Sequence, residues 1–216
     1  MAHPLAPALQ KGLDDLDLVL SLDTQTQLLA YLDLIAKWTK VYNLTAVRDA
    51  GEMLTHHLLD SLAVIAPLRR ELAKLPAENA PSLLDVGSGA GLPGVVIAIV
   101  CPEVSVTCVD TVAKKAAFIQ QVAVALRLPN LKGLHARVET LTQPFDVVCS
   151  RAFASLVDFT SWSRQALAPH GVWMAMKGKH PDQEMADLPA GVSVFHVEQL
   201  LVPGLGADRC IVWLRG

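Results

Sequence analysis

The segment from Asp85 to Gly94 places an acid and four glycines within ten residues, a pattern typical of a loop that binds a nucleotide or a related cofactor. The apolar segment 82–86 predicts a buried strand before this loop, and the apolar segment 94–100 predicts a buried helix after it. Glycine can adopt positive φ and lets a ligand approach the backbone, while the start of a helix offers N–H groups and a positive dipole end. We therefore expect the first unit of a nucleotide-binding α/β sheet here.

Two cofactors fit this pattern. Gly89-x-Gly91-x-x-Gly94 matches the dinucleotide-binding motif, so an NAD-dependent oxidoreductase is one interpretation. Asp85 favours S-adenosylmethionine (SAM), because a carboxylate at the strand end repels a pyrophosphate, whereas SAM carries an ammonium and a sulfonium and no phosphate. The sequence therefore predicts SAM as the cofactor, with the backbone of the glycine loop at residues 87, 89 and 91 open to its approach.

Further polar residues follow the later predicted strands. Asp110 ends the second strand, 19 residues after Gly91, where an acid can accept both ribose hydroxyls of an adenosine. Val138 and Glu139 follow the third strand, where the adenine ring would lie, and Arg151 follows the fourth. Ligands of parallel α/β sheets bind at the carboxyl ends of the strands, so we expect these side chains to meet the glycine loop. An ordinary surface acid or ion-pair partner is the alternative for each charged residue.

From residue 82 onward, apolar strand patterns alternate with helical ones. This order predicts an α/β fold whose sheet is mostly parallel, with a terminal hairpin that adds one antiparallel edge strand. The expected strands are 82–86, 104–109, 131–135, 145–149, 172–177, 192–197 and 210–214, and the expected helices are 94–100, 113–127 and one near 156–168.

The first part of the chain, residues 1–78, predicts a helical extension. Apolar residues recur at helical spacing, and Asp49 and Glu52 have the spacing of a capping box at a helix start. Pro67 and Pro76 interrupt the approach to the sheet, and residues 77–81 suggest a linker. We therefore expect the cofactor-binding domain to comprise residues 79–216.

Composition excludes several classes of protein. The longest apolar run, Leu92 to Cys101, is too short to span a bilayer, and the N-terminus lacks the pattern of a signal peptide, so we expect a cytoplasmic protein without membrane contact. The four cysteines form no C-x-x-C pair, which predicts reduced, buried thiols and no metal site. A net charge of −3 argues against a general nucleic-acid coat protein but permits a local basic face.

Several motifs occur together. The glycine loop is followed by Ser150-Arg151-Ala152-Phe153, and the helical extension contains Lys37-Trp38-Thr39-Lys40-Val41-Tyr42-Asn43-Leu44-Thr45 and a second motif at 52–62. Arg137-Val138-Glu139 and Lys177-Gly178 complete the set. In these motifs the chain, over about residues 28–177, resembles the GidB/RsmG family of bacterial 16S rRNA guanine-N7 methyltransferases.

That resemblance implies a class I, Rossmann-like, SAM-dependent methyltransferase fold with an N-terminal helical extension. It implies methyl transfer to N7 of guanine 527 in 16S rRNA, presented as naked RNA, a partial particle or the small ribosomal subunit, with no obligate protein partner. The family's cofactor contacts correspond here to Gly87, Leu92, Val138, Glu139 and Arg151, and the strand-end reasoning adds Gly89 and Asp110.

Basic residues near these motifs form a candidate RNA face, because phosphate contacts position RNA. The candidates are Arg48, His57, Lys114, Lys115, Arg151, Lys177 and Lys179. Solvated lysines and structural histidines are the alternatives. The chain departs from the family's usual residues at Thr39 (usually Asn), His56 (usually Arg) and Ala113 (usually Gly), and the change at His56 removes a fixed positive charge.

The expected chemistry needs no general base. Guanine N7 has an available lone pair, so no proton must leave before it attacks the methyl carbon. Catalysis should depend on alignment of base and methyl group and on electrostatics suited to a base becoming cationic, and we assign no catalytic residue. Methylation of another RNA position and a non-catalytic RNA-binding or cofactor-sensing protein are the alternatives.

Overall fold

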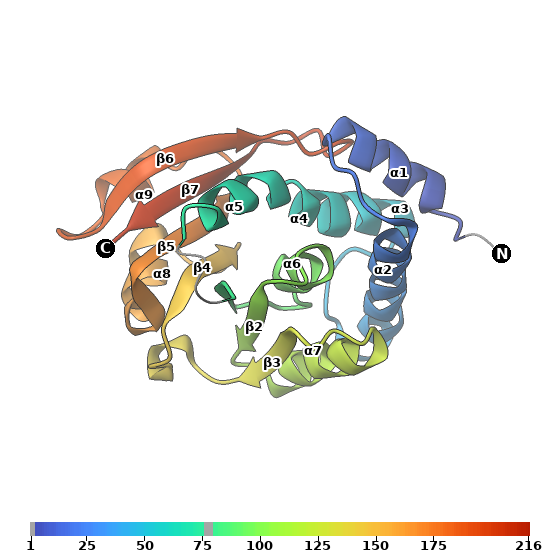
Figure 1. The fold of residues 1–216 in the computed structure, drawn as a ribbon, viewed down its shortest axis with the longest axis horizontal. Helices are drawn as coiled ribbons and strands as arrows, with labels where there is room; N and C mark the ends of the chain where they lie inside the picture. The colour runs from blue at the N-terminus through green and yellow to red at the C-terminus, as the bar shows by residue number, and fades with distance from the viewer. Residues whose placement is uncertain (1–2, 76–79) are drawn as a thin grey trace.

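The computed structural model describes residues 3–75 and 80–216, so the expected boundary at 78–79 and part of the linker lie outside the described residues. The strands form one sheet in the order β3-β2-β1-β4-β5-β7-β6 (Figure 1). Strands β1 to β5 run parallel, and β7 is antiparallel to both its neighbours. The strands are β1 (Ser82–Val86), β2 (Ser105–Asp110), β3 (Leu131–His135), β4 (Phe145–Arg151), β5 (Leu167–Lys177), β6 (Ser193–Leu200) and β7 (Arg209–Arg215).

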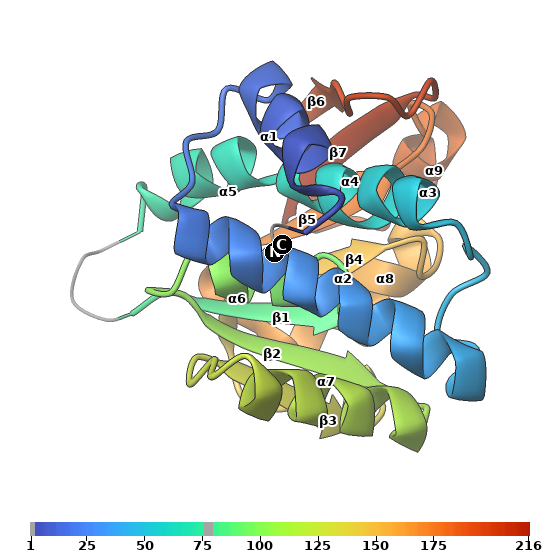
Figure 2. The same ribbon diagram turned by 90° about the vertical axis from the view of Figure 1, so that its right-hand side faces the viewer.

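Helices cover both faces of the sheet. Helices α6 and α7 pack on one face together with the helices of the extension, and Figure 2 shows α2 crossing over α6 and the first strands. The opposite face is covered by α8, η3 and α9. The helical elements are α1 (Ala6–Asp15), α2 (Leu22–Tyr42), α3 (Ala50–Met53), the π-helical η1 (Leu54–Leu59), α4 (Asp60–Leu62), α5 (Ile65–Leu72), α6 (Gly94–Val100), α7 (Ala113–Ala125), the 3₁₀ turns η2 (Val138–Thr140) and η3 (Arg164–Ala166), α8 (Leu156–Trp162) and α9 (Asp182–Ala186).

The extension and the sheet share one apolar core. Leu28 and Leu58 of the extension are fully buried in the same cluster as Leu83 of β1 and Val147 of β4. Neighbouring strand residues such as Leu84 point into the second core, because successive side chains of a strand alternate between faces. The four cysteines are buried and free, as the sequence predicts.

Local sequence explains where the extension's helices begin and end. The Ser21 hydroxyl accepts a hydrogen bond from Thr24 N at 3.1 Å at the start of α2, and Asn43 ends this helix in the left-handed conformation, with φ of 50°. The Asp49 carboxylate accepts from Glu52 N at 2.9 Å, which confirms the predicted helix start. Among residues 3–75 and 80–216, no helix is both long and apolar enough to cross a bilayer.

The prediction of one helix near 156–168 is wrong over its second half. Helix α8 ends at Trp162, and β5 already begins at Leu167. The Ser163 hydroxyl explains the early end, because it donates to a carbonyl one turn earlier and accepts from Trp173 Nε1 at 2.9 Å. The spacing of apolar residues that predicts a helix does not predict a contact with a residue of the following strand.

The terminal hairpin is confirmed, but the placement of its antiparallel strand at the sheet edge is wrong. Strand β7 lies between β5 and β6, and β6 forms the edge. Residues 210–214 of β7 are all buried, whereas β6 exposes Ser193, Phe195 and His196. A strand that is apolar on both faces is stabilised in the sheet interior, and the more polar strand takes the solvated edge.

Candidate active site

The glycine loop between β1 and α6 has the predicted left-handed conformation. Gly87, Gly89 and Gly91 have φ of 65°, 59° and 91°. Gly87 N donates to the Val109 carbonyl of β2 at 2.9 Å, which holds the loop over the sheet edge. A Cβ atom on Gly87 would overlap the Phe153 ring, so a side chain there would have to displace that ring.

Asp85 lies beneath this loop and not in a pocket. Its side chain is fully buried, and Oδ2 accepts a hydrogen bond from Gly94 N at 2.9 Å, at the first residue of α6. Burial raises the pKa of Asp85 to about 7, against the lowering effect of the Gly94 amide and the Arg151 charge. The expectation that Asp85 faces the cationic part of a cofactor is therefore wrong, because its carboxyl group caps the helix instead.

The buried Asp85 makes the stability of the protein depend on pH. Its pKa of about 7 in the folded chain exceeds the ordinary value of 3.8, so the stabilisation by its protonated form is lost as pH rises from about 4 to about 7. We expect Asp85→Asn to gain stability relative to the wild type across that range and to show a constant difference above it. Urea unfolding of both proteins at several pH values measures this, and parallel stability curves would contradict it. Other titrating groups are common to both proteins and cancel.

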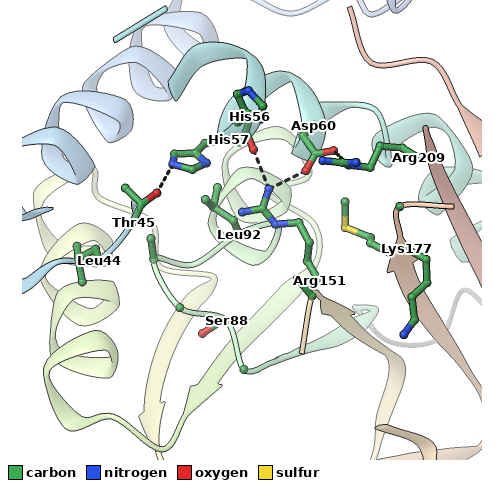
Figure 3. A pocket seen from close by; sticks show the side chains of 16 residues that line it. Leu44, Thr45, His56, His57, Asp60, Ser88, Leu92, Arg151, Lys177 and Arg209 are labelled. Carbon is green, nitrogen blue, oxygen red and sulfur yellow. Dashed lines mark hydrogen bonds and ion pairs between the residues drawn. The ribbon is translucent and has the colours of Figure 1, made fainter. Parts of the chain in front are cut away.

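Two adjoining pockets open beside the glycine loop. The first, which we call the Arg151 pocket, has a volume of about 420 Å³ and is walled on one side by the extension (Figure 3). The second, which we call the Asp110 pocket, has a volume of about 360 Å³ and lies over the ends of β1 and β2. Both are lined by Gly87 and Ala152, so the loop separates two halves of one site.

The structure brings every predicted cofactor residue to one of these pockets. Gly87, Gly89, Leu92 and Arg151 line the Arg151 pocket, together with His57 and Lys177. Asp110, Val138 and Glu139 line the Asp110 pocket, together with Lys115. Of the remaining candidate RNA contacts, Arg48, Lys114 and Lys179 line neither.

Asp110 binds the glycine loop as well as facing its pocket. Its Oδ2 accepts from Gly89 N at 3.0 Å, and its Oδ1 accepts from Val112 N at 2.8 Å. Lys115 Nζ lies 3.6 Å from Oδ2. A carboxylate has about four lone-pair sites, so Asp110 keeps acceptor capacity for ligand hydroxyls.

Arg151 is held by the extension on the far side of its pocket. Its Nη1 donates to Asp60 Oδ2 at 2.7 Å and to the His56 carbonyl at 2.9 Å (Figure 3). Asp60 Oδ1 accepts from Arg209 Nε at 2.9 Å. Sequence reasoning missed Arg209, because β7 carries no local signal that it reaches this pocket. Asp60 could have been noticed as an acid among the apolar residues of its motif.

His57 is a neutral residue of the pocket wall. It is 6% exposed, and its Nε2 lies 2.9 Å from the Thr45 hydroxyl oxygen. Burial, with a smaller contribution from the Arg151 charge, lowers the pKa of His57 from 6.5 to about 4. His57 therefore offers no positive charge to an RNA phosphate at neutral pH.

Among the other candidate RNA contacts, Arg48 is hydrogen-bonded within the fold, whereas two lysines are exposed. Arg48 donates to the Thr39 carbonyl at 3.2 Å and to Asn43 Oδ1 at 2.8 Å, which closes the turn after α2. Lys114 and Lys179 are exposed.

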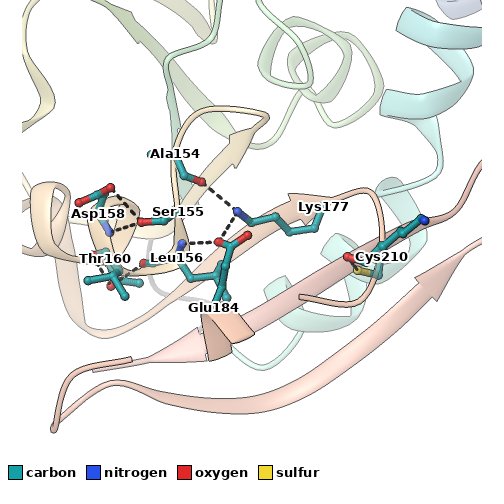
Figure 4. A network of polar contacts seen from close by, with 10 residues as sticks. Ala154, Ser155, Leu156, Asp158, Thr160, Lys177, Glu184 and Cys210 are labelled. Carbon is teal, nitrogen blue, oxygen red and sulfur yellow. Dashed lines mark hydrogen bonds and ion pairs between the residues drawn. The ribbon is translucent and has the colours of Figure 1, made fainter. Parts of the chain in front are cut away.

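Lys177 is bonded within the fold. It donates to the Ala154 carbonyl at 2.9 Å and to Glu184 Oε2 at 2.7 Å (Figure 4). The same Glu184 oxygen accepts from Leu156 N at 2.7 Å. Lys177 and Glu184 thus tie α9 to the segment between β4 and α8, which carries Phe153 over the glycine loop.

A second residue missed by sequence reasoning is Tyr31 of α2. Its side chain is fully buried, and its hydroxyl donates to the Ala90 carbonyl at 2.7 Å. The only sequence signal was its place among apolar residues of the amphipathic helix. The extension therefore contacts the glycine loop directly, in addition to forming a wall of the Arg151 pocket.

Residues 24–212 match the family described as rRNA small subunit methyltransferase G. The chain belongs to this family. Relatives with the name ribosomal RNA small subunit methyltransferase G include one from Polaromonas sp. strain JS666, 72% identical over 96% of this chain and 92% of the relative. Another, from Acidovorax sp. strain JS42, is 69% identical over 96% of this chain and 94% of the relative.

Solved structures confirm the fold class. TrmN from Thermus thermophilus superposes with a TM-score of 0.56 at 18% identity, covering 75% of this chain and 53% of TrmN. A SAM-dependent methyltransferase from Aquifex aeolicus superposes with a TM-score of 0.52 at 16% identity, covering 73% of this chain and 93% of the other. The protein is thus a methyltransferase of this family with the class I, Rossmann-like fold, and this assignment supports SAM as its cofactor.

Proposed function

We propose that this methyltransferase transfers the methyl group of SAM to N7 of guanine 527 in 16S rRNA, and that it acts in the cytoplasm. Membership of the small-subunit rRNA methyltransferase family supports the RNA class, and the motif resemblance supports the atom and the position. The observation that carries the proposal is the pair of pockets that meet at Gly87, because the Asp110 pocket can take the adenosine of a cofactor while the Arg151 pocket can take its amino-acid part and admit a base.

The residues present fit SAM. In our proposal the adenosine part lies in the Asp110 pocket, with Asp110 accepting from the ribose hydroxyls and with Val138 and Glu139 beside the adenine. The amino-acid part passes over Gly87 and Gly89 to Leu92 and Arg151, whose guanidinium suits a carboxylate. When bound, SAM would supply the methyl group, and its sulfonium sulfur would leave as a neutral thioether.

The chain's own residues bind and orient, and neither His57 nor Asp60 in the Arg151 pocket is set to remove a proton. His57 is neutral and bonded to Thr45, and both oxygens of Asp60 are bonded to arginines. This arrangement suits a nucleophile with an available lone pair, such as guanine N7. It does not suit an exocyclic amine or a ribose hydroxyl, each of which must lose a proton.

Mass spectrometry of the RNA product tests the proposal. The protein is incubated with SAM and with naked 16S rRNA, partial particles or small subunits that lack the modification. We expect 7-methylguanosine at guanine 527, and no product when that guanine is replaced by adenine. Methyl transfer to another atom or another nucleotide would refute the assignment while leaving the family membership intact.

Lys114 is the candidate RNA contact best tested by binding, because it is exposed and precedes Lys115, which lines the Asp110 pocket. We expect Lys114→Ala to weaken RNA binding, to lower the slope of log affinity against log salt by about 0.7, and to leave SAM affinity unchanged. Lys132→Ala is the matched control, because Lys132 is exposed near the start of β3, at the opposite end of the sheet. An equal effect of both variants would mean that Lys114 makes no specific phosphate contact.

A further inference from the structure

Asp60 lies where the extension meets the ends of β4 and β7. It is 1% exposed and follows directly on the π-helical η1. One carboxylate oxygen is 2.7 Å from Arg151 Nη1 and the other is 2.9 Å from Arg209 Nε. Asp60 therefore binds an arginine with each oxygen and, at 1% exposure, presents almost none of its surface to the pocket.

The two arginines need the negative charge of the Asp60 carboxylate to stay this close together. Two guanidinium groups converge on it, and the side chains of Arg151 and Arg209 are only 22% and 26% exposed, so water and salt screen their mutual repulsion less than at an open surface. Removing one partner from a buried ionic cluster leaves the remaining charges uncompensated. Without the Asp60 charge, we expect the Arg151 side chain to leave its observed position.

Both acceptors of Arg151 Nη1 belong to one short segment of the extension. The His56 carbonyl in η1 is 2.9 Å from the same nitrogen that donates to Asp60. Within residues 3–75 and 80–216, the Nε and Nη2 atoms of Arg151 have no hydrogen-bond partner. Arg151 is thus fixed from behind, and these N–H groups remain for a ligand in its pocket.

We infer that Asp60 is a positioning residue, which sets the affinity for SAM by holding Arg151 in the geometry that binds the cofactor. The inference rests on the cofactor role proposed above for Arg151. It assigns to the helical extension a part in cofactor binding that does not depend on any contact with RNA.

A double-mutant cycle tests whether Asp60 acts through Arg151. Calorimetric titration of SAM, without RNA, is performed on the wild type, Asp60→Asn, Arg151→Ala and the double variant. We expect Asp60→Asn to raise the Kd at least tenfold in the wild-type background and less than twofold in the Arg151→Ala background. A residue with only a general structural role would lower affinity equally in both. Glu198→Gln is the matched control, because it breaks another carboxylate–arginine pair, with Arg70, outside both pockets, and should leave the Kd unchanged.

The possible results separate the two hypotheses. If Arg151→Ala weakens SAM binding but Asp60→Asn does not, the inference about Asp60 fails and the proposed site stands. If Arg151→Ala leaves SAM affinity unchanged, the proposed cofactor role of Arg151 fails, and the inference falls with it. Equal effects of Asp60→Asn in both backgrounds also overturn the inference.

Thermal unfolding and circular dichroism establish whether each variant is folded. If Asp60→Asn does not fold, Asp60→Glu takes its place in the cycle, because it keeps the charge and shifts the carboxylate by one methylene. We expect a several-fold rise in the Kd for Asp60→Glu that is absent in the Arg151→Ala background. An unchanged Kd for this variant would count against the inference.

Discussion

Replacing Asp110 by alanine is expected to weaken SAM binding by about 1.5–3 kcal/mol, the range for hydrogen bonds to a charged group. This loss corresponds to a roughly tenfold to 150-fold rise in Kd. The carboxylate lies in the Asp110 pocket and retains acceptor capacity for the ribose hydroxyls. It also accepts from Gly89 N and Val112 N, so its removal loosens the glycine loop. Both effects act in the same direction. Calorimetric titration measures the change.

Asp110→Asn separates these two contributions. Asparagine keeps one side-chain oxygen, which can accept from one backbone N–H, but it lacks the charge and the second acceptor. We expect an affinity between those of the wild type and Asp110→Ala. Thermal unfolding serves as the control for global stability, and wild-type affinity in a folded Asp110→Ala would remove this residue from the cofactor site.

The second large effect concerns pH and the rate of methyl transfer. We expect the single-turnover rate to change by less than about twofold between pH 6 and 8, whereas a general base titrating in that range would give a tenfold rise per pH unit below its pKa. His57 is the histidine in the wall of the Arg151 pocket that the sequence singled out. Its pKa of about 4, lowered by burial, already leaves it neutral across this interval.

His57→Ala is the control for the pH profile. We expect the same flat profile for this variant, at a lower rate if the Thr45 contact helps to shape the pocket. A steep rise in the wild type that disappears in His57→Ala would demonstrate proton abstraction, and the assignment to guanine N7 would then be abandoned. Asp85 also titrates near pH 7, so Asp85→Asn is included to show that any residual slope comes from the helix cap.

At the acid end of this interval, His57 begins to destabilise the fold. Its pKa in the folded chain, about 4, is below the ordinary value of 6.5, so the unfolded chain binds the proton first as pH falls. The stability that neutral His57 contributes is complete above about pH 6.5 and is lost progressively as pH falls towards 4. A loss of rate in acid must therefore be compared with the folded fraction before it is read as chemistry.

The sequence alone determined the parts of this protein that depend on short-range patterns. The glycine loop between an apolar strand and an apolar helix was predictable, because glycines indicate positive φ and apolar runs indicate burial in the local sequence. Strand β1 and helix α6 have the bounds that the pattern indicates. Asp110 and Arg151 were predictable as pocket residues for a related reason. In a parallel sheet, polar residues at the carboxyl ends of strands converge at one edge.

Only the tertiary structure decided how those residues are used. Asp85 turned from a candidate ligand contact into a helix cap, and His57 from a candidate cation into a neutral wall residue, because burial changes the cost of charge and sequence spacing does not report burial. The bonds from Asp60 to Arg151 and Arg209 join residues 91 and 149 positions apart in the chain. No local pattern encodes such contacts, since they arise when the extension packs against the sheet and brings the end of β4 and the start of β7 beside the same carboxylate.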